Sequence, residues 1–201
     1  MNDKSDIKLA VRLANIERRN LLRDAMAGAP VTGHVIECGV GFGRSAQWLC
    51  KLTDKTVHGF DSFNGLPEDW VMSDDFTYPK GSFNTPKAIL TRLQTVDKLK
   101  LHIGLFEDTL RVWKGEYPGM IAFLHIDADL YSSCVTVLEE LNEQIVPGTV
   151  IVFDEIYETQ RYEYWEQGEY KAFCEWQEKH DRKVHMLDKT DMGQASFRII
   201  K

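Results

Sequence analysis

Short apolar runs alternate along the chain with segments whose apolar residues recur at helical spacing. The runs are short enough to be strands, and they lie at 35–38, 57–60, 99–103, 121–126 and 149–153. The helical pattern follows at 45–52, 86–93, after Tyr131, and at 168–179. Two last runs, 184–187 and 196–200, flank a turn with Asp and Gly and predict an antiparallel hairpin. This alternation predicts an α/β three-layer sandwich: a Rossmann-like, mostly parallel, seven-stranded sheet with a C-terminal antiparallel hairpin.

The segment before the first predicted strand places its apolar residues among Arg and Lys. Their mixed helical spacing predicts one or two amphipathic helices within residues 1–30, covering a sheet edge or a partner subunit. The residues concerned are Ile7, Leu9, Val11, Leu13, Ile16, Leu21 and Leu22. A length of 201 residues suits one well-filled domain and is short for two. We therefore expect a single domain over 1–201, with its core at 31–201.

The composition limits which binding partners and which cellular location are expected. Lys and Arg total 24 against 31 for Asp and Glu, a formal charge of -7, and no basic block is present. This balance argues against nucleic acid and anionic membranes as partners. No apolar run approaches the roughly 18 residues of a membrane span. We expect a soluble, cytoplasmic protein that does not bind a membrane.

The predicted helices and the cysteines supply candidate core residues. Trp48 and Leu49 should face inward in the helix at 45–52. The inner side of the helix at 168–179 should carry Tyr170, Phe173, Cys174 and Trp176. The cysteines are widely spaced, form no C-x-x-C pair and lie in apolar stretches, so we expect reduced core residues; they are Cys38, Cys50, Cys134 and Cys174.

A glycine-rich loop follows the first predicted strand. Three glycines on alternate positions come after Glu37, and a helix begins near Ser45; the glycines are Gly39, Gly41 and Gly43. Such a loop suits a charged small molecule, because free N–H groups at the helix start face the turn. The dinucleotide fingerprint would need glycine at position 44, which is Arg44. An ordinary strand–helix turn is the alternative.

The register of this loop, acid-x-G-x-G-x-G, resembles the first motif of class I S-adenosylmethionine-dependent methyltransferases. An acid at the end of the next strand should then accept the ribose hydroxyls. Asp61, 22 residues after Gly39, is that acid, and Ser62 follows it. By analogy with related enzymes, Ser45 would receive the methionine carboxylate, while Phe106 and Glu107 would flank the adenine.

A long stretch separates Asp61 from the helix at 86–93. Residues 62–85 contain Pro, Gly and Asp, and a loop of this length in a compact domain usually has a function. We interpret it as a flap over the site, with a disordered insertion as the alternative. The aromatic stretch at 157–165 could form a wall against an acceptor or pack the following helix. Histidines in or near the strands are assigned no chemistry: His58, His102, His125 and His185.

Paired acids end two of the predicted strands. Asp127 and Asp129 follow the run at 121–126, and Asp154 and Glu155 follow the run at 149–153. Adjacent parallel strands bring their carboxyl ends together, and like charges need a cation between them. Oxygen ligands without His or Cys favour Mg²⁺ or a similar ion. The alternative for each acid alone is a solvated strand end, and for Asp129 a helix N-cap.

Four blocks together resemble the macrocin O-methyltransferase family, in family order. They lie at 60–67, 104–110, 125–133 and 153–157. The resemblance implies an enzyme that uses S-adenosylmethionine and Mg²⁺ to methylate a hydroxyl, often on a sugar of a natural product. It also implies metal ligands at Asp127, Asp154 and Glu155, Asp127 beside the cofactor, and Asp129 as the base. The family usually has Asp at position 155, so Glu155 departs from the pattern.

Two other functions remain open at this stage. A catechol-type O-methyltransferase shares the sheet and the metal site but has Lys three residues after the first metal Asp, where this chain has Leu130. A non-catalytic protein that binds S-adenosylmethionine would not need the acid cluster. The expected partner is a small hydroxylated substrate, with a sugar and a homo-oligomer as open possibilities.

Overall fold

The computed structural model describes residues 4–158 and 162–201, with side chains from residue 13 onward. In this part of the chain, a seven-stranded sheet has the order β5-β2-β1-β6-β7-β9-β8. Its parallel strands are β1 (His34–Cys38), β2 (Val57–Asp61), β5 (Leu99–Ile103), β6 (Ile121–Ile126) and β7 (Val150–Phe153). The antiparallel pair is β8 (Val184–Lys189) and β9 (Ala195–Ile199), and β9 pairs with β7.

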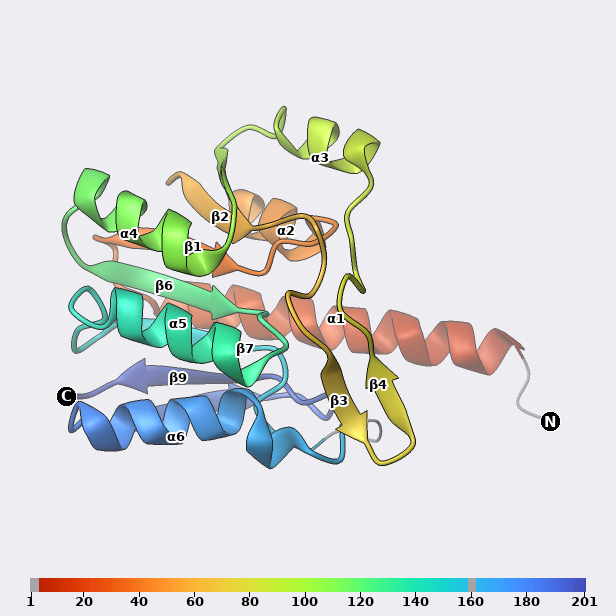
Figure 1. Cartoon of the computed structure of the whole chain (residues 1–201). Helices are drawn as coiled ribbons and strands as arrows, with labels where there is room; N and C mark the ends of the chain where they lie inside the picture. Colours follow the sequence, from red (N-terminus) through yellow and green to blue (C-terminus); the bar gives the residue numbers. More distant parts are fainter. Residues whose placement is uncertain (1–3, 159–161) are drawn as a thin grey trace.

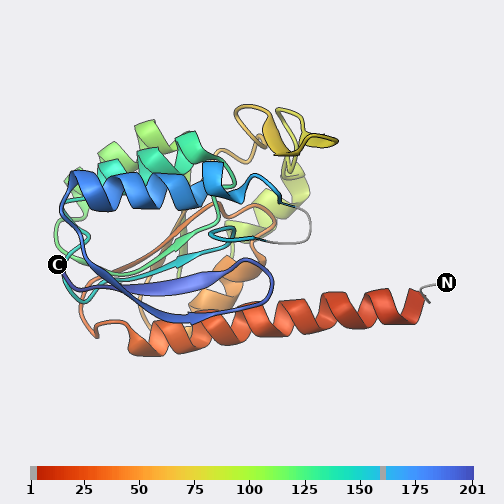
Figure 2. The same cartoon turned by 90° about the horizontal axis from the view of Figure 1, so that it is seen from below.

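Helices cover both faces of this sheet, which gives three layers (Figures 1 and 2). One face carries α4 (Phe106–Glu116), α5 (Tyr131–Leu141) and α6 (Glu169–Lys179). The other carries α1 (Lys4–Gly28), α2 (Arg44–Leu52) and α3 (Lys87–Leu93). A short 3₁₀ helix, Trp165–Gln167, precedes α6. The predicted Rossmann-like sandwich with its terminal hairpin is therefore confirmed.

Burial explains why these segments form this sheet. Every residue of β6 and of β7 is buried, as expected for central parallel strands that helices cover on both faces. Trp113 of α4 and Leu138 of α5 pack on one side of the sheet, and Leu22 of α1 and Leu49 of α2 pack on the other. Two apolar layers thus hold the carboxyl ends of the strands in fixed positions.

The segment before the sheet is one helix. The second half of α1 packs across a face of the sheet through Leu21, Leu22 and Ala25, rather than along an edge. Its first half extends beyond the body of the molecule (Figure 2). The side chains of the predicted apolar residues Ile7, Leu9 and Val11 lie outside the described set.

Two of the expectations about inward-facing side chains are wrong, those for Tyr170 and Cys174. Trp48 packs against the core as expected, although it is only half-buried, and its indole Nε1 donates to the Arg19 carbonyl of α1. Tyr170 and Cys174 are exposed, because the apolar stripe of α6 that faces the sheet is narrow and consists of Ala172, Phe173 and Trp176. The other three cysteines are buried and free, as expected.

The stretch between β2 and α3 contains an antiparallel hairpin. Its strands are β3 (Trp70–Ser73) and β4 (Phe76–Tyr78), and it projects over the carboxyl end of the sheet (Figure 1). Trp70 and Met72 are buried against Leu66, Leu130 and Tyr162. This small apolar cluster holds the hairpin above the strand ends, where the predicted site residues lie.

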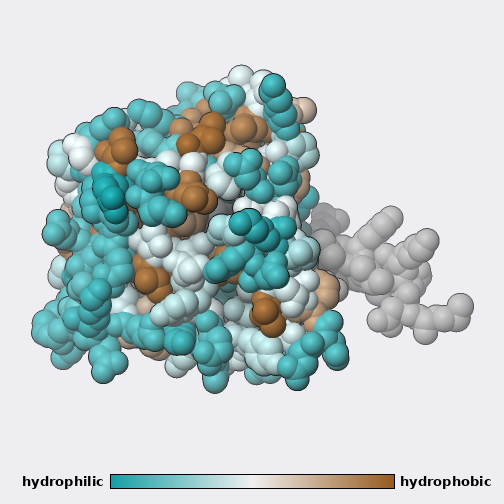
Figure 3. Space-filling view, viewed as in Figure 1, coloured by the Kyte–Doolittle hydropathy of each residue, from teal (hydrophilic) through white to brown (hydrophobic). Residues whose placement is uncertain are grey.

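None of the helices in the described ranges combines the length and apolar character that a membrane span requires. The surface seen from the direction of Figure 1 is mainly hydrophilic, with small, separated hydrophobic patches (Figure 3).

Candidate active site

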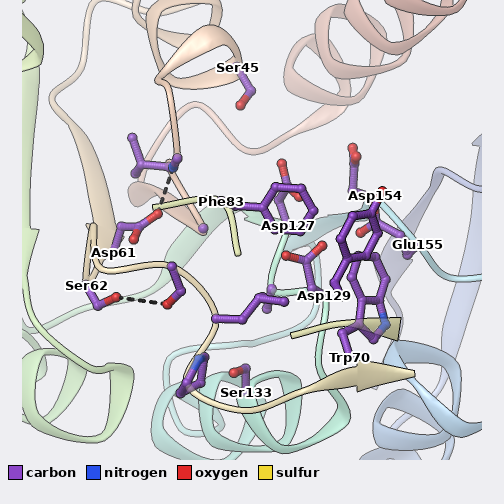
Figure 4. A pocket seen from close by; sticks show the side chains of 18 of the residues that line it. Ser45, Asp61, Ser62, Trp70, Phe83, Asp127, Asp129, Ser133, Asp154 and Glu155 are labelled. Atoms are coloured by element: carbon purple, nitrogen blue, oxygen red, sulfur yellow. Dashed lines mark hydrogen bonds between the residues drawn. The ribbon is translucent and has the colours of Figure 1, made fainter. Parts of the chain in front are cut away.

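A cavity of about 1640 Å³ opens at the carboxyl ends of the parallel strands. The glycine loop, the strand-end acids, the hairpin and one side of α1 line it together. Figure 4 shows the four acids Asp127, Asp129, Asp154 and Glu155 gathered on one side of this cavity, opposite Asp61 and Ser62. The fold therefore brings together most of the site residues predicted from sequence.

The glycine loop needs glycine for two different reasons. Gly39 has a φ of 92°, and a Cβ on it would lie 1.7 Å from the carbonyl oxygen of Asp127. Gly43 has a φ of 75° and precedes the first turn of α2. The loop consequently lies against the backbone of the Asp127 segment, while the N-terminus of α2 opens toward the cavity.

Asp61 fastens this loop from the neighbouring strand. Its Oδ2 accepts the backbone N–H of Gly41 at 2.7 Å, and its Oδ1 accepts that of Phe63 at 2.6 Å. Burial raises the pKa of Asp61, and the two backbone donors oppose that shift. The carboxylate also lines the cavity. Each of its oxygens can accept a second hydrogen bond, as a ribose acceptor requires.

Of the other residues predicted to bind the cofactor, some line the cavity and others lie beneath its surface. Ser45, Ser62, Phe106 and Glu107 line the cavity. Glu37 and Gly43 are not among the lining residues. Glu37 is fully buried beneath the loop, where its carboxylate contacts the His125 Nδ1 at 2.9 Å.

The strand-end acids form one cluster. Carboxylate oxygens of Asp127, Asp129 and Glu155 all lie within 4.8 Å of one another. Burial, and then the charge of neighbouring acids, holds the pKa values of Asp129 and Glu155 well above their ordinary range. Without an added cation, these two groups therefore tend to keep their protons.

Arg18 of α1 places a positive charge in this cluster. Its Nη2 donates to the Asp127 carboxylate, and its Nε lies 2.7 Å from the Asp154 Oδ1 as an ion pair. Burial raises the pKa of Asp154, but Arg18 and the His125 ring outweigh this effect and lower it. Asp154 is thus held ionised, in contrast to Glu155 beside it.

Two further buried residues, Glu169 and His125, contact the acid cluster or its backbone. Glu169 at the start of α6 accepts the backbone N–H groups of Ala128 and Glu155, each at 3.1 Å, and so connects the two acidic loops. Burial raises the pKa of Glu169 to about 8. His125 lies between Glu37 and Asp154, with its Nε2 3.6 Å from the Asp154 Oδ1.

Neither Arg18 nor Glu169 was predicted from the sequence, and His125 was assigned no chemistry. Arg18 and Glu169 belong to amphipathic helices, where a charged residue ordinarily indicates a solvent-exposed face. A signal existed only for His125, which lies two residues before Asp127 in a strand that is otherwise apolar.

The acid cluster fits a hard divalent cation. The Glu155 Oε2 is buried and has no hydrogen-bond partner among the described residues. Oxygens of three carboxylates lie within 4.8 Å of one another, and oxygen donors of this kind suit Mg²⁺. Asp154 and His125 form a second group with Asp127. Asp127 therefore belongs to both possible ligand sets.

The structure also bears on the alternative explanation for Asp129. Leu130, not Asp129, is the N-cap residue of α5, and no side chain caps this helix. Asp129 has a φ of 60°, an uncommon conformation for a residue other than glycine, and it lines the cavity. A capping role does not account for its position.

The aromatic side chains of the cavity wall come mainly from the β3–β4 hairpin and the residues that follow it, rather than from residues 157–165. Trp70, Tyr78 and Phe83 line the cavity, and Trp70 lies close to the acids in Figure 4. Of the aromatic residues predicted after β7, Tyr162 lines the cavity. Tyr157, Tyr164 and Trp165 are not among the lining residues.

The parallel sheet, with its glycine loop after β1 and an acid as the last residue of β2, defines the Rossmann-like methyltransferase class of folds. Among solved structures, the calicheamicin methyltransferase CalS11 is similar with a TM-score of 0.69 and 22% identity, covering 98% of this chain and 80% of that chain. The O-methyltransferase NovP has a TM-score of 0.69 and 20% identity, with 92% and 81% covered.

The sequence comparison identifies the family. The macrocin-O-methyltransferase (TylF) model matches residues 9–181, and the chain therefore belongs to this family. A curated relative from Streptomyces olivaceus, 8-demethyl-8-(2,3-dimethoxy-alpha-L-rhamnosyl)-tetracenomycin-C 4'-O-methyltransferase, is 27% identical over 142 residues, 62% of this chain. The chain spans about half of that relative's length, 53%. The resemblance predicted from the four sequence blocks is thus confirmed.

Proposed function

We propose that this protein is an S-adenosylmethionine-dependent O-methyltransferase that methylates a sugar hydroxyl of a natural-product intermediate with the help of Mg²⁺. The observation that carries the proposal is the convergence of Asp127, Asp129 and Glu155 beside the glycine loop. The curated relative supports the acceptor class, because its name specifies the 4'-hydroxyl of a rhamnosyl group.

S-adenosylmethionine would supply an electrophilic methyl group on its sulfonium. We assign its methionine carboxylate to Ser45 and the N-terminus of α2, and its ribose to Asp61. Phe106 and Glu107 line the same cavity at the start of α4, where the adenine would lie. Gly39 and Gly41 let the backbone approach the ligand, and Gly43 allows the turn into α2. Ser62 and Asp127 complete the wall, while buried Glu37 supports the loop from beneath.

Asp127, Asp154 and Glu155 are the residues that would hold Mg²⁺. When bound, the ion would act as a Lewis acid that lowers the pKa of the acceptor hydroxyl. Asp129 would accept the hydroxyl proton, because its carboxylate lines the cavity beside these acids. The acceptor would lie between this cluster and the aromatic side chains Trp70 and Phe83, with its oxygen directed at the methyl group.

The experiment that tests this proposal measures methyl transfer from S-adenosylmethionine to nucleotide-activated deoxysugars and to rhamnosylated aromatic glycosides. EDTA should abolish turnover, and Mg²⁺ should restore it. Asp127→Asn should lower activity in a manner that excess Mg²⁺ partly restores, because weaker binding is offset by concentration. Asp129→Asn should lower turnover by about a hundredfold or more at any Mg²⁺ concentration.

Three outcomes would contradict parts of the proposal. Full turnover in EDTA would exclude the metal role. Equal rescue of both variants by Mg²⁺ would remove the distinction between ligand and base. Cofactor binding by calorimetry, with no transfer to any sugar or catechol acceptor, would favour a non-catalytic binding protein.

A further inference from the structure

Arg18 occupies the position between two of the acids that a divalent ion would need. Its guanidinium pairs with both Asp127 and Asp154, and the same two carboxylates are members of the possible ligand sets. A guanidinium and a divalent ion cannot both lie between these oxygens, because the two positive charges would repel each other at close range.

The permanent charge of arginine makes this competition for the same position unavoidable. A guanidinium is always charged in proteins, so it cannot make room for an ion by losing a proton. The side chain must instead leave its partners. The side chain can move into the cavity, because Arg18 lines the cavity and its side chain is 26% exposed.

The position of Arg18 on α1 connects this exchange to the helix. Leu21 and Leu22, one turn further along, are buried against the sheet and fix the second half of α1. Arg18 precedes these docked residues, and the first half of α1 extends beyond the body of the molecule (Figure 2). Its two ion pairs connect α1 to the acids at the carboxyl ends of β6 and β7.

We propose that Arg18 is a built-in competitor of the divalent ion, so that ion binding at Asp127 and Asp154 displaces Arg18 and loosens α1 before residue 18. The inference rests on the metal site of the proposed function. Linkage makes the coupling reciprocal: whatever weakens the Arg18 pairs tightens ion binding, and ion binding weakens the Arg18 pairs.

The test measures Mn²⁺ affinity by calorimetry in the absence of substrate. Arg18→Met removes the competing charge and keeps the length of the side chain, so it should bind Mn²⁺ about tenfold or more tightly than the native chain, within the usual range for such coupling. Arg18→Lys should lie between the two. Arg23→Met is the matched control, because Arg23 lies on the same helix but pairs with Asp24 at the surface.

A second readout follows the helix itself. Mn²⁺ should increase hydrogen exchange in the backbone of α1 before residue 18 in the native chain, and it should have no such effect in Arg18→Met. Arg18→Met leaves buried acids unpaired, so its melting temperature without Mn²⁺ should fall and then recover with Mn²⁺ more than that of the native chain.

The outcomes separate this inference from the proposed metal site. Equal Mn²⁺ affinity in the native chain and in Arg18→Met would overturn the competition and leave the metal site intact. Weaker binding in Arg18→Met would also overturn it, since Arg18 would then support the ion. No binding to either protein would overturn both proposals.

Discussion

Asp61 contacts the glycine loop with both of its carboxylate oxygens while it also lines the cavity. Asp61→Asn should retain part of the hydrogen bonding to the loop and lose the charge offered to the ribose. Loss of a charge-assisted hydrogen bond amounts to roughly 1.5–3 kcal/mol, so the affinity for S-adenosylmethionine should fall about tenfold or more. Isothermal titration gives the dissociation constant. Asp97→Asn, an exposed acid elsewhere, should leave it unchanged.

Gly39 and Gly41 offer a matched pair of substitutions within the same loop. A Cβ at Gly39 would collide with the Asp127 carbonyl, whereas a Cβ at Gly41 would meet no atom within 4 Å. Gly39→Ala should therefore lower the free energy of unfolding by about 3 kcal/mol or more, combining backbone strain with overpacking. Gly41→Ala should cost only about 1 kcal/mol, from its left-handed conformation. Urea denaturation would measure both, and equal losses would contradict this explanation.

At the scale of elements, the β3–β4 hairpin and the residues that follow it, up to Phe83, form the part of the cavity wall where substitutions should be tolerated best. Phe83 is 44% exposed and lines the cavity, while Phe76 is 48% exposed and does not. Phe83→Ala should raise the KM for the acceptor about fivefold, the loss of one aromatic contact, without altering cofactor affinity. Phe76→Ala should leave both quantities unchanged. A shift in cofactor affinity alone would place Phe83 beside the methyl donor instead.

Strands β2 and β5 carry a histidine pair that should make stability depend on pH. The His58 Nδ1 lies 3.1 Å from the His102 Nε2, and His58 is buried. Burial, together with the neighbouring His102, lowers the pKa of His58 to about 4, below its value of about 6.5 in an unfolded chain. The unfolded state therefore binds more protons between these values, and stability falls as pH falls through this window.

The size of this effect follows from linkage. Between pH 7 and pH 5, His58 should cost the native protein about 2 kcal/mol of unfolding free energy. Other buried acids also titrate in this range, so the measured quantity is the difference between native protein and His58→Asn in urea denaturation at both pH values. His185→Asn, a substitution of an exposed histidine, should retain the native pH dependence. Identical pH dependence in all three proteins would show that the pair has no such role.

At the scale of the whole molecule, the sheet and the convergence of the strand-end acids with the glycine loop were predictable because they depend on local rules. Strand-end acids and the glycine loop follow apolar runs, and adjacent parallel strands deliver their ends to one edge. The pairing of β6 with β7 places Asp127 and Asp154 there, as the sequence predicted. The roles of Asp129 and Glu155 stay predictions until the variants are measured.

Contacts made by helices could not be predicted in this way. Arg18 reaches Asp127 across 109 positions of sequence, and Glu169 reaches Ala128 across 41. Both contacts depend on the rotation and the depth at which a helix docks on the sheet, which its apolar stripe specifies only coarsely. The same uncertainty explains why Tyr170 and Cys174 were expected to face inward although they are exposed.

The contact between Gly39 and the Asp127 backbone has a consequence for how such a protein can diversify. The backbone N–H of Asp127 donates to the carbonyl of Cys38, directly before the loop, and the N–H of Gly39 donates to Phe60 of β2, so both segments are fixed to the central strands. A lineage that acquires a new acceptor therefore cannot alter the distance between these two segments without unfolding the centre of the sheet. Its substitutions should instead accumulate at residues 66–83, in the β3–β4 hairpin and its flanks, which line part of the cavity but carry none of the residues proposed to bind the metal or the methyl donor. Laboratory evolution toward a new acceptor should begin with Trp70, Tyr78 and Phe83.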